Sequence, residues 1–392
     1  MELKQIADVL NTIKMPNSLG EVTTIADDLS NVDEGIDLSN LTDDTIKDYN
    51  GQFAVSVINI FRQEADFSED TFGLYHDEIE YGGLLQVTRN RGRLKAFNTP
   101  ILTLESINDD PNAPDYNDSH YYGANVSTKV YSKDSADELR YSVPNSMFKQ
   151  SFTSAEDVQK LVSLITHNYS NTMASMLKEL ARGVLLMVIK DCKANGRVIH
   201  AFTKYNAING LQEGDDGYVT LDNYRSNIQF RLYMQEILQG LKDNMLDYNK
   251  KYNDGTVEIF SREDDLRTIV LSDFARQMKF TQGLVYNPDK TDVGEITKIN
   301  FWQNASTDLF PSISATSVHD QIKVDNGEGV DPTVIDHCVA LVMDKFTAGI
   351  TNKMLKSRPK YVPEGDFTTI FTAILKKYWY DSRDVAVIVT LD

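Results

Sequence analysis

The chain has 392 residues, a net charge of −19 and a sequence pI of about 4.7. An acidic surface repels phosphate backbones, so the charge argues against direct recognition of nucleic acid, although a protein could still enclose DNA without gripping it. The N-terminus builds no apolar signal-peptide region and no run of about 18 apolar residues occurs, so we expect neither a secretion signal nor a membrane-spanning helix.

Residues 15–46 form an acidic segment without Lys or Arg. Single apolar residues separate the acids with no strong period, and such a segment is not expected to fold alone. It is either a disordered tail or an arm that orders only against a neighbouring subunit, because apolar residues such as Ile25 and Leu29 keep recurring. The acids are Glu21, Asp27, Asp28, Asp33, Glu34, Asp37, Asp43 and Asp44.

An apolar run over residues 53–61 predicts a buried element, either a strand or a short helix. Residues 84–97 then resemble a strand, residues 109–115 are rich in turn formers, and residues 124–131 and 139–143 again resemble strands. We interpret residues 84–143 as a long excursion with extended flanks and an acidic tip at Asp109 and Asp110.

Four cations alternate in the first flank: Arg89, Arg91, Arg93 and Lys95. On a strand this spacing places them on one face. The stripe is a solvated strand face, a contact for an acidic surface on another copy of the chain, or a contact for DNA. For the second interpretation, the candidate acidic residues are Asp109 and Asp110 at the tip and Asp27 and Asp28 in the N-terminal segment.

A helical stripe of apolar residues extends from Val158 to Cys192, directly after the capping-box pattern Ser154–Asp157. At 1.5 Å per residue, this helix would be roughly 55–60 Å long. The mean helix of a globular protein has only about 11–12 residues. We therefore expect a structural spine.

The remaining elements alternate between helix and strand, which predicts an α+β fold. The pattern predicts helices over residues 223–248 and 272–280, strands over 265–271, 296–302, 337–343 and 384–391, and an element of ambiguous type over 367–380.

Signatures of catalysis are missing from the sequence. Cys192 and Cys338 lie far apart, which argues against a disulfide framework or zinc site and fits a reducing cytoplasm. The acidic turn at residues 215–222 lacks the ligand spacing of a calcium loop, and residues 76–78 lack the cysteines that a zinc site would need. His337 and Cys338 are adjacent, so a strand would point them to opposite faces. We expect no catalytic residue, cofactor or metal.

The order of elements resembles the major capsid proteins of tailed bacteriophages, whose shell fold is often called the Johnson fold, with the closest likeness to small short-tailed podophages. The stretches that carry the resemblance are residues 80–85, 141–154, 266–271, 286–290 and 340–345, with the strand near Val387. The resemblance implies an N-terminal arm (1–50), a first part of the P-domain (51–83), an extended E-loop (84–143), a P-domain with the spine helix (144–205), an A-domain (206–349) and a return to the P-domain (350–392).

The resemblance also implies partners. These are other copies of the chain in hexamers and pentamers, a separate scaffolding protein, a portal protein at one vertex, and enclosed DNA that is not bound by sequence. Assembly would take place in the bacterial cytoplasm and would lead to the virion capsid. Three alternatives stay open at this point: an encapsulin-like container, a metal-dependent hydrolase using the Asp-rich loops, and an adaptor or other virion part.

Overall fold

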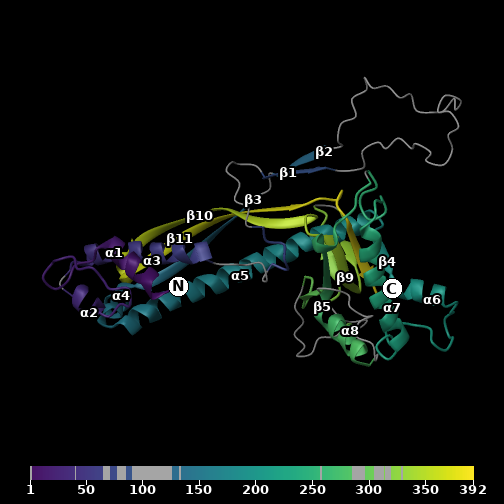
Figure 1. Cartoon of the computed structure of the whole chain (residues 1–392), viewed down its shortest axis with the longest axis horizontal. Helices are drawn as coiled ribbons and strands as arrows, with labels where there is room; N and C mark the ends of the chain where they lie inside the picture. The colour runs from purple at the N-terminus through teal and green to yellow at the C-terminus, as the bar shows by residue number, and fades with distance from the viewer. Residues whose placement is uncertain are drawn as a thin grey trace, which may run out of the picture. The chain divides into compact units, whose positions relative to one another are not determined.

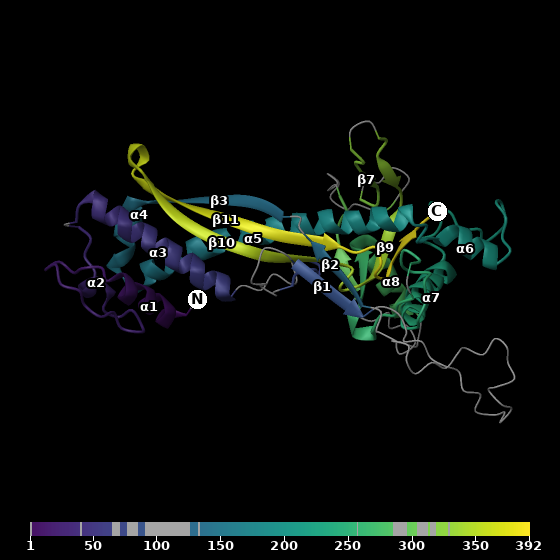
Figure 2. The ribbon, with the colours of Figure 1, turned by 90° about the horizontal axis from the view of Figure 1, so that it is seen from above.

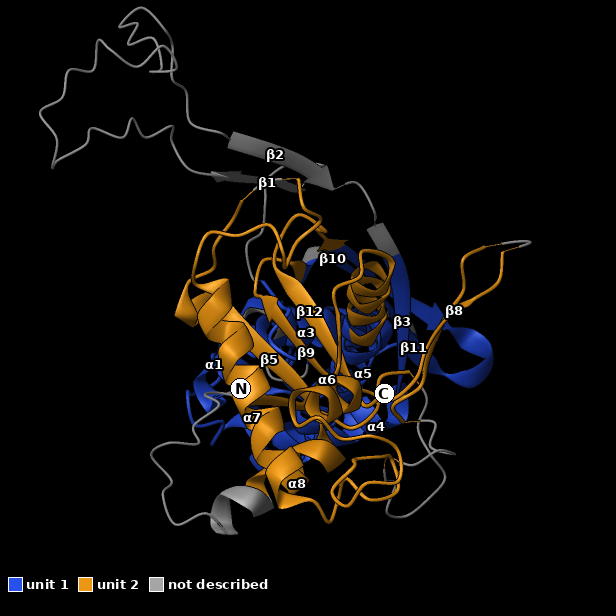
Figure 3. Cartoon of the chain, turned by 90° about the vertical axis from the view of Figure 1, so that its right-hand side faces the viewer, with its two compact units in different colours: residues 1–81, 133–181, 349–378 blue, residues 82–132, 182–348, 379–392 orange. Residues whose placement is uncertain are grey.

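The computed structural model describes residues 2–39, 41–64, 71–76, 85–90, 126–131, 134–256, 258–284, 296–303, 313, 319–327 and 330–392. It divides into two compact units, coloured separately in Figure 3. The first comprises residues 1–81, 133–181 and 349–378, and the second comprises residues 82–132, 182–348 and 379–392.

The first unit combines helices with a three-stranded sheet of order β10-β11-β3 (Figure 1). Strands β11 and β3 are antiparallel, with Phe367 opposite Pro144 and Ile370 opposite Tyr141. The elements are α1 (Leu3–Ile13), α2 (Val32–Gly35), α3 (Asp43–Glu64), β3 (Asp134–Pro144), α4 (Asn145–Gln150), a 3-10 turn (Ser151–Thr153), most of α5 (Ala155–Ala194), β10 (Ala348–Val362), a 3-10 turn (Pro363–Gly365) and β11 (Phe367–Tyr380).

Aromatic side chains fill the core between α3 and α4 in this unit. The ring of Phe53 lies 5.8 Å from that of Phe148 and 5.9 Å from that of Phe152, in tilted and edge-on arrangements that aromatic pairs prefer. The apolar run over residues 53–61 is therefore part of helix α3, which settles the choice between strand and helix.

The expected spine helix is confirmed. Helix α5 has 40 residues, about 60 Å at 1.5 Å per residue. Ser154 caps it as the sequence indicates: its hydroxyl donates to the Asp157 carboxylate at 2.8 Å and accepts from the Asp157 N–H at 3.2 Å.

The acidic N-terminal segment differs from both expectations for it. Ile25, Leu29 and Val32 are at most 3% exposed within this single chain, so the segment packs on its own unit rather than only on a neighbour. Side-chain hydrogen bonds replace the missing helical period: Asn11 of α1 holds both the N–H and the carbonyl of Ile25, at 2.7 and 3.0 Å. The expected arm boundary at residue 50 falls inside α3.

The second unit is built around a five-stranded sheet of order β4-β12-β9-β5-β6. Its central strand β9 is buried at every position, which fits a strand covered on both faces. The elements are β1 (Leu85–Asn90), β2 (Val126–Tyr131), the end of α5, β4 (Val198–His200), α6 (Ala201–Ile208), α7 (Ile228–Met245), a 3-10 turn (Glu263–Asp265), β5 (Leu266–Leu271), α8 (Ser272–Leu284), β6 (Ile296–Ile299), β7 (Ile322–Val324), β8 (Thr333–Ile335), β9 (Cys338–Asp344) and β12 (Ala386–Thr390).

The predicted helices and strands of this unit are confirmed in type, with ends that shift by a few residues, and the ambiguous element over 367–380 is strand β11. Strand β1 pairs with β2 from Leu85 opposite Tyr131 to Asn90 opposite Val126. The expected excursion thus begins in paired strands, but its expected end at residue 143 falls inside β3, which pairs with β11 in the first unit. Its acidic tip lies outside the described residues.

Candidate assembly surfaces

The structure places one pair of predicted interface residues, Asp27 and Asp28, on the surface of the first unit. Asp27 and Asp28 occupy a turn between the buried Ile25 and Leu29. The turn is held by Asn31, whose side-chain oxygen accepts from the Ala26 N–H at 2.8 Å. Because the apolar neighbours point inward, both carboxylates are exposed.

Asp28 keeps its negative charge to lower pH than an ordinary aspartate. The Ser30 side chain and the Ser30 N–H, at 3.0 Å, donate to its carboxylate and lower its pKa. Asp37 behaves in the same way, because the Ser39 hydroxyl at 2.6 Å and the Ser39 N–H lower its pKa. This surface therefore stays anionic well below neutral pH.

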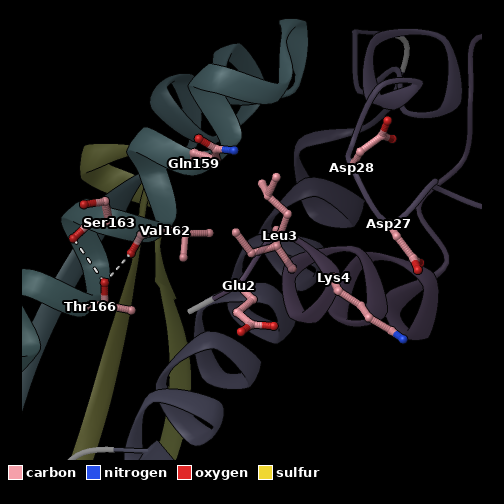
Figure 4. Close-up of a pocket in the computed structure, with 10 residues that line it drawn as sticks. Glu2, Leu3, Lys4, Asp27, Asp28, Gln159, Val162, Ser163 and Thr166 are labelled. Carbon is pink, nitrogen blue, oxygen red and sulfur yellow. Dashed lines mark hydrogen bonds between the residues drawn. The ribbon is translucent and has the colours of Figure 1, made fainter.

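The Asp27–Asp28 turn borders an open hollow of about 760 Å³ (Figure 4). Helix α1 supplies Leu3, which is 37% exposed, and α5 supplies the buried Val162. Apolar side chains thus lie beside carboxylates, an arrangement suited to a protein segment with apolar and cationic groups. The full lining is Glu2, Leu3, Lys4, Ile6, Asp27, Asp28, Gln159, Val162, Ser163 and Thr166.

Sequence reasoning missed this hollow. Its walls come from α1, the Asp27 turn and α5, and no local pattern indicates that these three segments meet. Val162 is an apolar position of the predicted spine helix, whereas no element was predicted around Leu3.

The side chains of the other predicted interface residues lie outside the described part of the chain. Arg89 lies on β1 with its backbone opposite Ser127, but its side chain is outside the described part. Arg91, Arg93, Lys95, Asp109 and Asp110 lie outside the described residues altogether. Their role at an interface stays a prediction.

The two cysteines and His337, which were candidates for chemistry, lie in structural environments. The thiols of Cys192 and Cys338 are free and buried, and burial raises the pKa of Cys192 to about 12 and that of Cys338 further. Nδ1 of His337 lies 2.5 Å from Oδ2 of Asp320. Across the described ranges, no three His, Cys, Asp or Glu residues gather to hold a metal ion, and no helix is long and apolar enough to cross a membrane.

The sequence matches the family model of the Phi29-like phage major capsid protein over residues 108–384, more than two thirds of the chain. The chain belongs to this family. It is accordingly a capsid shell protein, a structural protein and not an enzyme, and its α+β fold is that of phage major capsid proteins. This assignment corrects the alternative of a metal-dependent hydrolase.

Solved phage capsids resemble the chain at low identity. The capsid structure of Staphylococcus phage Andhra matches with 11% identity and a TM-score of 0.41, covering 81% of this chain and 83% of that one. The capsid structure of cyanophage P-SCSP1u matches with 11% identity and a TM-score of 0.41, covering 81% and 86%. A comparison with curated proteins found no match. The family match therefore carries the assignment.

Proposed function

We propose that copies of this chain assemble as hexamers and pentamers into an icosahedral head that encloses double-stranded DNA. A separate scaffolding protein guides assembly in the bacterial cytoplasm, and a portal protein occupies one vertex. The match to the Phi29-like major capsid family carries this proposal. A 40-residue helix, too long for one small core, and a surface lined by exposed carboxylates support it.

Within this proposal, residues 1–50 are the N-terminal arm, 51–83, 144–205 and 350–392 the P-domain, 84–143 the E-loop and 206–349 the A-domain. The chain would serve a short-tailed phage. The acidic character of the whole chain suits a container that encloses DNA without binding its sequence.

The full chain, expressed in bacteria alone and together with the other head proteins of its phage, is expected to form closed shells visible by negative-stain electron microscopy. A subunit of a closed shell meets several neighbours, and stable interfaces bury about 1,200–2,000 Å² each. A compact monomer at high concentration under both conditions would contradict the proposal. Open rings would indicate an adaptor instead.

We further propose that the stripe Arg89, Arg91, Arg93 and Lys95 docks on an acidic surface of an adjacent subunit, with Asp27, Asp28, Asp109 and Asp110 as candidate acceptors. An exposed ion pair contributes only about 0.2–1 kcal/mol, but in a symmetric shell the same contact recurs at every subunit.

The double variant Arg89→Glu with Arg93→Glu is expected to lower shell yield, most strongly at low salt, because screening acts over about 8 Å at 0.15 M. Shell yield across a salt series is the measurement. A compensating Asp28→Lys should restore part of the yield. Unchanged yield at low salt would show that the stripe is a solvated strand face.

A further inference from the structure

Strand β10 carries a second row of alternating cations. Lys356, Arg358 and Lys360 are all exposed. Their spacing of two residues places them on one face of the strand, over about 13 Å. Figure 2 shows β10 at the edge of the sheet, next to β11.

The intervening residues of β10 show which face this is. Pro359 lies against Gly51 of α3, where an added Cβ would come within 2.7 Å of the proline Cβ. Ser357 Oγ lies 3.0 Å from Oγ1 of the buried Thr372 on β11. Since Ser357 and Pro359 face the helical side of the unit, the three cations face away from it.

Within the described part of their own unit, the three cations have no counter-charge in contact. Among the described residues, no ion pair involves Lys356, Arg358 or Lys360. Two carboxylates of the sheet are engaged elsewhere: Asp137 lies 2.8 Å from Lys376 and Glu138 lies 2.7 Å from Arg140. As far as the described residues extend, the stripe is therefore an uncompensated positive surface on a chain with a net charge of −19.

One simple explanation is protection of an edge strand, because Lys and Pro on an edge discourage pairing with other chains. The other residues on the cationic face of the sheet indicate a contact with another protein surface as well. Phe371 of β11 lies on the same side, half-buried, with the Arg140 guanidinium 5.4 Å from its ring. Arginine and aromatic side chains are enriched at protein interfaces, whereas a protective edge needs charge alone.

We propose that this stripe docks on the acidic lobe of a second copy of the chain, an inference that rests on the proposed shell function. The acidic lobe consists of the exposed residues Glu21, Asp27, Asp28, Asp33 and Glu34. Among the described residues, none of these five forms an ion pair within its own chain. Hydrogen bonds from Ser30 keep Asp28 ionised.

The two surfaces are different patches of the same unit, so their contact is heterologous. Heterologous contacts between identical copies generate closed rings when the rotation closes. Such rings are the pentamers and hexamers that a shell needs. A second copy fits the stripe better than DNA, because the neighbouring aromatic face suits a protein surface and the acidic chain as a whole repels phosphates.

The test reverses the stripe with Lys356→Glu, Arg358→Glu and Lys360→Glu in the full chain, expressed with the other head proteins of its phage. The matched control reverses three exposed cations of the second unit, Lys193→Glu, Lys204→Glu and Lys250→Glu, for the same change in net charge. We expect the stripe variant to stay folded by circular dichroism and to lose at least tenfold in shell yield, while the control assembles.

Compensation identifies the partner surface. Asp27→Lys with Glu34→Lys should restore assembly of the stripe variant, because neither carboxylate serves a hydrogen bond within the described part of the fold. If the triple Glu variant does not fold, Lys356→Gln with Arg358→Gln and Lys360→Gln takes its place. We then expect a smaller loss of shell yield, restored by the same substitutions in the acidic lobe.

Wild-type yield from the stripe variant would overturn the proposal. Normal shells that hold less DNA would also overturn it and assign the stripe to nucleic acid, and loss without compensation would exclude the acidic lobe. Failure of the unmodified chain to form shells would instead refute the proposed function.

Discussion

Replacing Arg197 by alanine is expected to lower the free energy of unfolding by about 3–5 kcal/mol, the usual cost of removing one partner of a buried ion pair. The Arg197 side chain is 2% exposed and pairs with the Asp191 carboxylate at the end of α5. Its guanidinium also donates to the carbonyls of Tyr252 at 3.3 Å and Ala386 at 3.2 Å. The substitution removes one donor from each carbonyl and the counter-charge from a half-buried carboxylate, which keeps a hydrogen bond from the Asn195 amide at 3.1 Å.

The loss should grow as pH rises. Burial raises the pKa of Asp191, and Arg197 opposes this effect. Without Arg197 the folded-state pKa rises further above the unfolded value, so the folded state binds more protons. The stability that this protonation gives is present below the unfolded pKa and is lost as pH rises through the folded pKa.

Urea unfolding from pH 4 to pH 7 measures both effects, provided that assembly is suppressed by low concentration. Arg197→Lys is the matched control: it keeps the charge but not the planar fork, so it should lose less stability. If alanine costs under 1 kcal/mol at pH 7, the ion pair does not stabilise the fold, and a larger cost that does not depend on pH would contradict the expected rise in the pKa of Asp191.

The sequence predicts best those elements in which the pattern of apolar residues matches the buried face. The apolar stripe from Val158 to Cys192 repeats with helical spacing because one side of α5 is buried along its length, and Ser154 marks its start. Strand β12 is apolar at nearly every position because it lies inside a five-stranded sheet. In both elements, local pattern and tertiary environment agree.

Among the parts of the fold that the sequence did not predict, two are held by tertiary contacts. Strand β10 carries Pro359 among alternating cations, a pattern that argues against a central strand but is compatible with an edge. The acidic segment has no helical period, and Asn11 and Asn31 hold it through hydrogen bonds to its backbone. The local sequence around Ile25 does not show that Asn11, 14 residues earlier, binds its backbone.

For the candidate surfaces too, some features follow from the local sequence and others only from the fold. Exposure of Asp27 and Asp28 follows from their alternation with apolar residues, and the structure places them together. The hollow beside them depends on α1 meeting α5, which only the fold establishes. The β10 cations alternate with the same period of two as the Arg89 stripe, which is typical of a strand. Pro359 lies among them and argues against a strand, so the pattern did not lead to a prediction.

Replacing residues Thr99–Tyr121 by a short Gly-Ser turn is expected to leave a soluble, folded subunit that forms no shells. The strands that flank this segment, β1 and β2, pair from Leu85 opposite Tyr131 to Asn90 opposite Val126, so a short connection can still join them. An excursion of this length within a compact chain is normally functional or disordered. Its loss should therefore remove contacts between subunits rather than contacts within one.

Circular dichroism and sedimentation measure the folding of the deletion variant, and electron microscopy of the particles measures its assembly. A Gly-Ser segment of the original length is the control, because it keeps the reach of the excursion and removes only its side chains. Failure of both variants to assemble would place the contacts in the side chains of residues 99–121, and failure of the shorter one alone would make length the decisive property. Closed shells from the deletion variant would show that the segment is dispensable and would contradict the assignment of residues 84–143 as an intersubunit E-loop.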